Sequence, residues 1–239
     1  MNKFKNLLIV LLLAAVVLLS AAVLRLSQSN QTESQFDEDR SALTETDANS
    51  GTEAGDDETQ KAEASAELEC SVQLGSLRIL RGEAFGIQEG DAGDCEAYLE
   101  DGVYTVSVRT SREAPVVVTV PEEVRFEQAT LTASGGNLTA EDLDVEELYT
   151  TCEQGSLRFS GRVGRTAEVE HLQGETVLQL SGGASEFNYD LAYELGHIEV
   201  GEQSYAGAKG SRSIDNGSEK TIRVHCAMGS VGVLFPEES

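Results

Sequence analysis

The chain has 239 residues and combines 42 acidic with 17 basic side chains, which gives a formal net charge of −25. This acidic excess argues against nucleic acid as a partner, because surfaces that bind nucleic acid are basic. Aromatic residues make up 5% of the chain and tryptophan is absent, so any core must consist mainly of aliphatic residues and threonine.

Residues 1–26 have the features of an export signal. Lys3 and Lys5 precede an apolar stretch from Leu7 to Leu24 that only Ser20 interrupts. Eighteen helical residues span about 27 Å, enough to cross a thin hydrocarbon core. The pattern predicts a transmembrane signal-anchor that leaves the rest of the chain outside the cytoplasm. The small residues Ser20 and Ala22 leave cleavage after Ala22, and hence secretion, as the alternative.

Residues 27–67 form a polar, acidic segment. Between Ser27 and Glu69, thirteen acidic residues accompany two basic ones, and large apolar residues are almost absent. Such a segment buries too little apolar surface to offset the entropy lost on ordering. We therefore expect a disordered linker, which charge repulsion keeps extended.

Residues 68–236 carry a pattern that recurs around glycine, with apolar and polar residues alternating on both sides. The glycines at the centre of this pattern are Gly75, Gly136, Gly155, Gly174, Gly196 and Gly229. From Gly136 onward the spacings are 19, 19, 22 and 33 residues. Alternation of period two inside a repeating unit is typical of stacked β coils. The sequence thus predicts an all-β domain: a single-stranded parallel β-solenoid-like stack of two-strand coils of about 19–22 residues.

Each coil is expected to join its two strands at the glycine, where the backbone needs positive φ or a close approach. Stacking in chain order aligns equivalent positions of successive coils. The position two residues after the glycine forms an inward column of Leu138, Leu157, Thr176, Ile198 and Val231. The position one residue after it is outward and polar: Asn137, Ser156, Glu175, His197 and Ser230.

The longest spacing indicates an insertion between the last two coils, from Glu202 to Lys220. It is rich in glycine, serine and charged residues, and we expect it to leave the stack on one side. Repeat proteins often bind partners through such insertions. Tyr205, Lys209 and Arg212 are therefore the candidate contact residues.

The carboxy-terminal coils resemble a known bacterial family. The runs Phe187–Leu191, Gly196–Gly201, Ile214–Gly217 and Cys226–Val231 are similar to the repeats of the putative-adhesin β-repeat family. The resemblance covers about Leu68 to Phe235. It implies an amino-terminal membrane segment and an outward β-stacked domain, and it supplies no catalytic residues that would carry over.

The chain's four cysteines raise the question of disulfides, because exported proteins often contain them. Cys152 and Cys226 share an inward column, and stacking in chain order places them three coils apart, about 14 Å. A disulfide requires Cα atoms within about 7 Å, so we expect two buried, unbonded thiols. Whether Cys70 pairs with Cys95 stays open. His171 falls beside Cys152 and suggests a two-ligand thiolate–imidazole site, but zinc requires more ligands. We expect a core side chain bonded to backbone, and neither metal nor cofactor.

Three functions compete at this stage. The first is a non-enzymatic, membrane-tethered extracytoplasmic scaffold or adhesin-like domain, which has the membrane and an extracellular ligand as partners. The second is a cell-envelope sensor or regulatory subunit that acts with a membrane protein. The third, a polysaccharide-acting enzyme, is disfavoured, because such sites use carboxylates in aromatic-lined grooves and the outward columns hold few aromatics.

Overall fold

The computed structural model describes residues 66–90 and 93–236, which are the described residues below. They form sixteen β-strands and one short 3-10 helix, so the all-β prediction is confirmed. Among the described residues, no helix is long and apolar enough to cross a membrane. The predicted signal-anchor lies outside the described residues, as does the predicted linker except for its last two residues, which begin β1.

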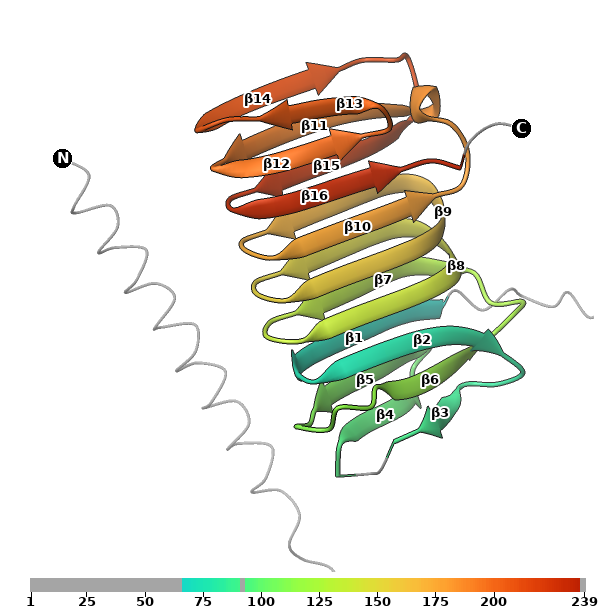
Figure 1. Ribbon diagram of the computed structural model, residues 1–239. Coiled ribbons are helices and arrows are strands. Elements are labelled where there is room, and N and C mark those ends of the chain that lie inside the picture. Colours follow the sequence, from blue (N-terminus) through green and yellow to red (C-terminus); the bar gives the residue numbers. More distant parts are fainter. Residues whose placement is uncertain (1–65, 91–92, 237–239) are drawn as a thin grey trace, which may run out of the picture. The chain divides into compact units, whose positions relative to one another are not determined.

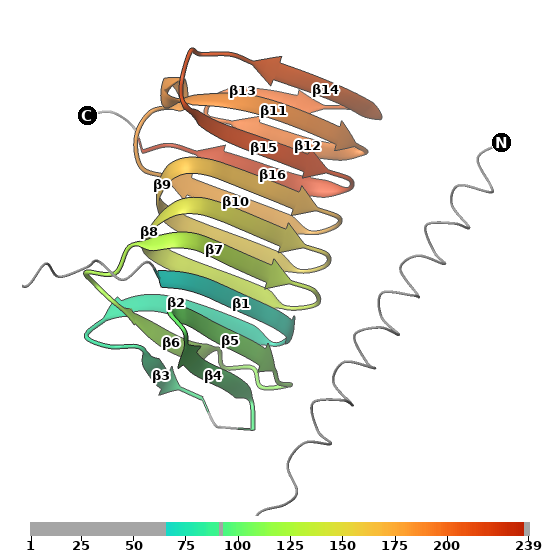
Figure 2. The same ribbon diagram turned by 180° about the vertical axis from the view of Figure 1, so that it is seen from behind.

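The strands form two ladders, which pack against each other as the two sides of one stack of coils (Figures 1 and 2). In spatial order, ladder A contains β4 (Cys95–Glu100), β5 (Val103–Arg109), β1 (Ala66–Leu74), β7 (Phe126–Ala133), the second halves of β8 (Asn137–Cys152) and β9 (Ser156–His171), β15 (Lys220–Cys226), β11 (Phe187–Glu194) and β14 (Lys209–Ile214). Ladder B contains β3 (Gly86–Glu89), β6 (Val116–Pro121), β2 (Ser76–Gly82), the first halves of β8 and β9, β10 (Glu175–Leu180), β16 (Gly229–Leu234), β12 (Gly196–Val200) and β13 (Gln203–Ala206).

A coil is a ladder A strand followed by the next ladder B strand. All pairs between coils are parallel, and only the outermost strands of each ladder are antiparallel. In spatial order the coils are β5–β6, β1–β2, β7–β8, β8–β9, β9–β10, β15–β16 and β11–β12. Each coil buries one side of both strands against the opposite ladder, so the core runs along the whole stack.

The predicted alternation is present in register. Residues Leu138, Leu157, Thr176, Val231 and Ile198 are consecutive partners in ladder B and all are buried. Their outward neighbours Asn137, Ser156, Glu175, Ser230 and His197 form a parallel row with partly or fully exposed side chains. Alternation of period two places these residue types on opposite faces of the ladder.

The turns inside the coils form one edge of the stack, the glycine edge, visible as a column of loops in Figure 1. Gly155 has φ of 117° there, and a Cβ on it would lie 2.1 Å from the Gly136 carbonyl oxygen. Gly174 repeats this geometry against the Gly155 carbonyl oxygen. A side chain at either position would collide with the turn of the neighbouring coil, so glycine is required for coils to stack at this distance.

The chain does not visit the coils in spatial order, so the prediction of stacking in chain order is wrong. The Gly229 coil lies between the Gly174 and Gly196 coils, because β16 pairs with both β10 and β12. The last coil in the described chain, β15–β16, therefore lies between two coils that precede it in sequence. As a consequence, Cys226 on β15 is the register partner of His171 on β9. Cys226 therefore lies two strands from Cys152 on β8, and not three coils away as predicted.

The amino-terminal end has the mirror arrangement. Coil β1–β2 lies between coil β5–β6 and coil β7–β8, although it comes first in the chain. Antiparallel strands cover the outer coil at each end: β3 and β4 at one end, β13 and β14 at the other. Residues 203–214 are thus an end cap and not, as expected from the sequence, an excursion from the side of the stack.

Candidate functional site

The predicted contact residues do not share one surface. Tyr205 lies on β13 opposite Ile198 and packs partly against the core. Lys209 and Arg212 lie on β14, in the other ladder, opposite Glu194 and Leu191. Lys209 makes an ion pair with Glu194, and its charge lowers the pKa of that carboxyl group. The three residues are therefore spread over the end cap rather than gathered into a site.

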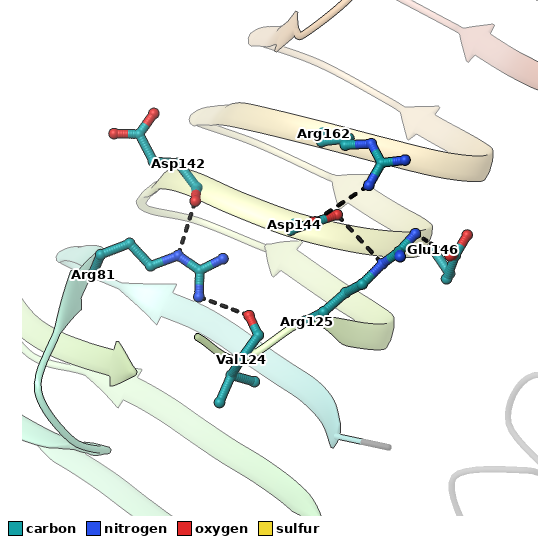
Figure 3. Close-up of polar contacts among 7 residues, drawn as sticks. All are labelled: Arg81, Val124, Arg125, Asp142, Asp144, Glu146 and Arg162. Carbon is teal, nitrogen blue, oxygen red and sulfur yellow. Dashed lines mark hydrogen bonds and ion pairs between the residues drawn. The ribbon is translucent and has the colours of Figure 1, made fainter. Parts of the chain in front are cut away.

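Opposite the glycine edge is the crossover edge, where coils connect. Residues 122–125, the first crossover, pass over coil β1–β2 on their way from β6 to β7. The Arg81 guanidinium at the end of β2 holds this segment (Figure 3). It donates to the carbonyl oxygens of Pro121 at 2.7 Å, Val124 at 2.8 Å and Asp142 at 2.9 Å. One side chain thus satisfies backbone acceptors of three segments, which fixes the crossover against two coils.

Next to Arg81, charged side chains of three coils alternate along the crossover edge (Figure 3). Asp144 lies between Arg125 at 3.5 Å and Arg162 at 3.6 Å, and Arg125 also pairs with Glu146. Each of these side chains is more than one third exposed, so the pairs contribute little to stability. The charges neutralise one another, and the arrangement supports alignment of the coils rather than recognition of an ion.

The second crossover, residues 181–186, ends in a 3-10 helix (Ala184–Glu186) and passes over coil β15–β16. Here a lysine of the coil beneath takes the place of Arg81. Lys220 Nζ lies 2.9 Å from a Glu186 carboxylate oxygen and 5.2 Å from the centre of the Phe187 ring. The Gly183 amide donates to the other Glu186 oxygen, and this bond together with Lys220 lowers the pKa of the carboxyl group.

His171 is the centre of a buried column inside ladder A. Its imidazole is 0% exposed, with Cys152 and Cys226 as its partners on the two flanking strands. Nδ1 lies 2.9 Å from Thr176 Oγ1, while Nε2 lies beside the backbone of Gly174 and Met228 without a hydrogen bond of normal geometry. The ring thus has the Thr176 hydroxyl as a side-chain partner, with the backbone of Gly174 and Met228 beside it. Burial lowers its pKa and raises that of both flanking thiols.

All four cysteines are free and buried. Cys152 and Cys226 are unbonded as predicted, although His171 lies between them instead of two full coils. Cys70 on β1 and Cys95 on β4 are separated by β5, which leaves about two strand spacings, or roughly 10 Å, between their backbones. That exceeds the reach of a disulfide, so the pair left open by the sequence is not bonded. No group of three metal-ligating side chains gathers within the part of the chain that the structure describes.

The outer face of ladder A carries an uncharged row that the sequence pattern did not single out. Ser107, Ser71, Thr132 and Thr151 are consecutive partners on β5, β1, β7 and β8 and form what we term the hydroxyl row. Ser71 Oγ donates to Ser107 Oγ at 3.2 Å. Their separation in sequence hides the row, because chain order and spatial order differ at this end. Neighbouring hydroxyls recur at the strand spacing of about 4.8 Å.

The hydroxyl row continues into charged pairs toward the carboxy-terminal end. Glu170 and His225 follow Thr151 in register and lie 3.0 Å apart, and Arg223 pairs with Glu168 at 2.6 Å one row away. The hydroxyl row itself is uncharged, but carboxylates adjoin it, because exposed Glu96 is the partner of Ser107 on β4 and exposed Glu69 lies two residues from Ser71 on the same face. The row consists of short side chains on a ladder, a surface suited to contact with an extended polar ligand rather than to enclosing a small molecule.

No protein-family model matches the chain, and no curated protein matches it. Among solved structures, a putative cell adhesion protein from Clostridium sporogenes is similar at 14% identity and a TM-score of 0.47, covering 72% of this chain and 93% of that one. A putative adhesin from Bacteroides fragilis is similar at 8% identity and a TM-score of 0.30, covering 71% of this chain and 93% of that one.

Proposed function

We propose that the protein is a non-enzymatic, membrane-tethered scaffold whose β-solenoid-like domain displays ladder A outside the cytoplasm as an adhesin-like binding face. The hydroxyl row carries this proposal, because it is a regularly spaced line of uncharged hydroxyl groups across four adjacent strands. The formal net charge of −25 disfavours polyanions as partners, so the ligand that fits is a neutral polar polymer. The tether is the apolar stretch of residues 1–26, which lies outside the described residues.

The end strands of the stack support a display function. Open strand edges invite pairing with other chains, but two of the four end strands, β3 and β13, are only four residues long, which limits such pairing. The end strand β14 carries Lys209 and Arg212, and charges on an edge strand discourage further pairing. A capped stack can therefore present its faces at the cell surface without extending into fibres.

In-cell photo-crosslinking tests the binding face. A photoreactive residue replaces Thr132 in the hydroxyl row, and the matched control carries it at Val177, on the outer face of ladder B. We expect crosslinking of surface polysaccharide from position 132 and none from position 177. Capture of an integral-membrane protein instead would favour the sensor or regulatory subunit. Release of reducing ends from surface glycans by the purified protein would contradict the non-enzymatic assignment.

A further inference from the structure

The strand at which the chain enters the described domain is an inner strand. β1 begins at Ala66, and its residues 67–72 pair in parallel with β5 on one side and with β7 on the other. Its inward side chains Leu68, Cys70 and Val72 are buried in the core. Edge strand β4, by contrast, pairs on one side only, with β5, among the described residues. A first strand at the end of a stack would need only one neighbour, so its inner position requires a reason.

From this placement we propose that the inserted first coil is a load-bearing anchor, which transmits force from the amino-terminal tether into the stack without unfolding. The inference rests on the proposed function, because a tethered binding domain is pulled between residue 66 and its ligand. An edge strand can be peeled away one hydrogen bond at a time. An inner strand cannot leave within the plane of the ladder, and sliding β1 along its own axis breaks its hydrogen bonds to β5 and to β7 together.

The first crossover adds to this resistance. Ala66 pairs with Phe126, so the chain enters β1 at the crossover edge, beside the segment that passes over coil β1–β2. Arg81, which belongs to that coil, holds the crossover through Pro121 and Val124. The outer coil β5–β6 therefore cannot move away from β1 without breaking these bonds. The coil that receives the load is thus enclosed by the outer coil and by the crossover connected to it.

Single-molecule pulling on the full-length chain in a detergent micelle tests the anchor. Both experiments use a second handle at Gln154, which is exposed in a turn on the glycine edge, so that force acts along the strands. The first handle is attached at Glu67 on β1 or, for comparison, at Asp101 in the turn between β4 and β5. We expect a rupture force from Glu67 at least about twice that from Asp101, since β1 must shear from β5 and β7, whereas the β4–β5 hairpin must shear from β1 alone. An equal or lower force from Glu67 would overturn the proposal, whether or not the protein is tethered in cells.

Substitutions on β2 test the role of the crossover. Arg81→Ala should lower the rupture force from Glu67, because the crossover is then no longer held against the coil that receives the load. Arg78→Ala is the matched control, because Arg78 lies on the same strand but makes only an exposed ion pair with Glu141. Arg81→Lys serves if the alanine variant fails to fold, and it should show an intermediate force. Unchanged force from Glu67 in whichever of the two Arg81 variants folds would refute the contribution of the crossover.

Discussion

The two ends of the stack have the same topology but different chemistry. At each end one coil lies between two others out of chain order, a pair of antiparallel strands covers the outer coil, and a crossover passes over the inserted coil. At the amino-terminal end Arg81 holds the crossover by its backbone carbonyls. At the carboxy-terminal end Lys220 holds it by the Glu186 carboxylate and the Phe187 ring. The topology is thus compatible with quite different contacts.

The difference has an electrostatic consequence. Carbonyl acceptors do not titrate, so the contacts of Arg81 are present at any pH at which the domain is folded. The Glu186 carboxylate has a lowered pKa because of the Gly183 amide and Lys220. A lowered carboxyl pKa gives stability that is present above its ordinary value of 4.5 and is lost as pH falls. The carboxy-terminal crossover should therefore loosen first in acid.

The largest expected effect comes from the buried phenylalanine at which each crossover ends. Phe126 begins β7, Phe187 begins β11, and both are 0% exposed. Phe126→Ala and Phe187→Ala should each lower the free energy of unfolding by about 3–5 kcal/mol in urea titrations. Phe187→Ala should cost at least as much, since its ring also contacts Phe235. The exposed Tyr98→Ala is the control, and a loss below about 1 kcal/mol at either phenylalanine would contradict equal roles for the two crossovers.

Arg81 and Lys220 should differ in their contributions. Arg81→Ala leaves partly buried carbonyl oxygens without their donor and should cost about 2 kcal/mol. Lys220→Ala removes a partly exposed ion pair and a ring contact and should cost about 1 kcal/mol or less. Urea unfolding of both variants beside Arg78→Ala makes the comparison. A larger loss of unfolding free energy in Lys220→Ala than in Arg81→Ala would reverse this comparison of the two ends.

His171 should make the carboxy-terminal insertion sensitive to pH. Burial lowers its pKa below 6.5, so protonation favours the unfolded chain. The free energy of unfolding keeps its full value above about pH 6.5. At lower pH it decreases, by at most about 1.4 kcal/mol per pH unit. His171→Asn should flatten this slope in urea titrations between pH 7.5 and 5.5, while the exposed His225→Asn should retain it. Hydrogen exchange should show β15 losing protection before β1, and an unchanged slope in His171→Asn would contradict the assignment.

The smallest effect concerns Leu195, where a bulky residue has φ of 55° and is 70% exposed. A left-handed backbone conformation costs a non-glycine residue about 1–2 kcal/mol. Substitution by glycine removes this cost, but glycine loses more conformational entropy on folding, which offsets part of the gain. Leu195→Gly should therefore raise stability by about 1 kcal/mol or less in thermal unfolding. Gly229→Ala should do the opposite, because a Cβ there would lie 2.4 Å from the Gly174 carbonyl oxygen. No stabilisation at Leu195 would indicate that the end cap imposes this backbone conformation at no cost.

The strands and turns were predictable because they depend on local pattern. Val224 and Cys226 alternate with outward Arg223 and His225, and any ladder that buries one face fixes that alternation. The hairpin turn at Asp101 and Gly102, both with positive φ, follows from residue types that favour such turns. The candidate contact residues were misplaced because the cap strands pair on one side only and lack the buried alternation that marks a strand.

The sequence by itself determined which residues form the inner strands of the coils, which of their side chains are buried and where glycine is needed, because these follow from steric limits and burial within a single coil. Only the tertiary structure decided which coil lies beside which. Thr176 has Leu157 as its partner on one side and Val231 on the other, so the shared register does not distinguish the preceding coil from a later one. Each of the two crossovers passes over one coil, and the resulting order brings His171 between two thiols and places β1 inside the stack.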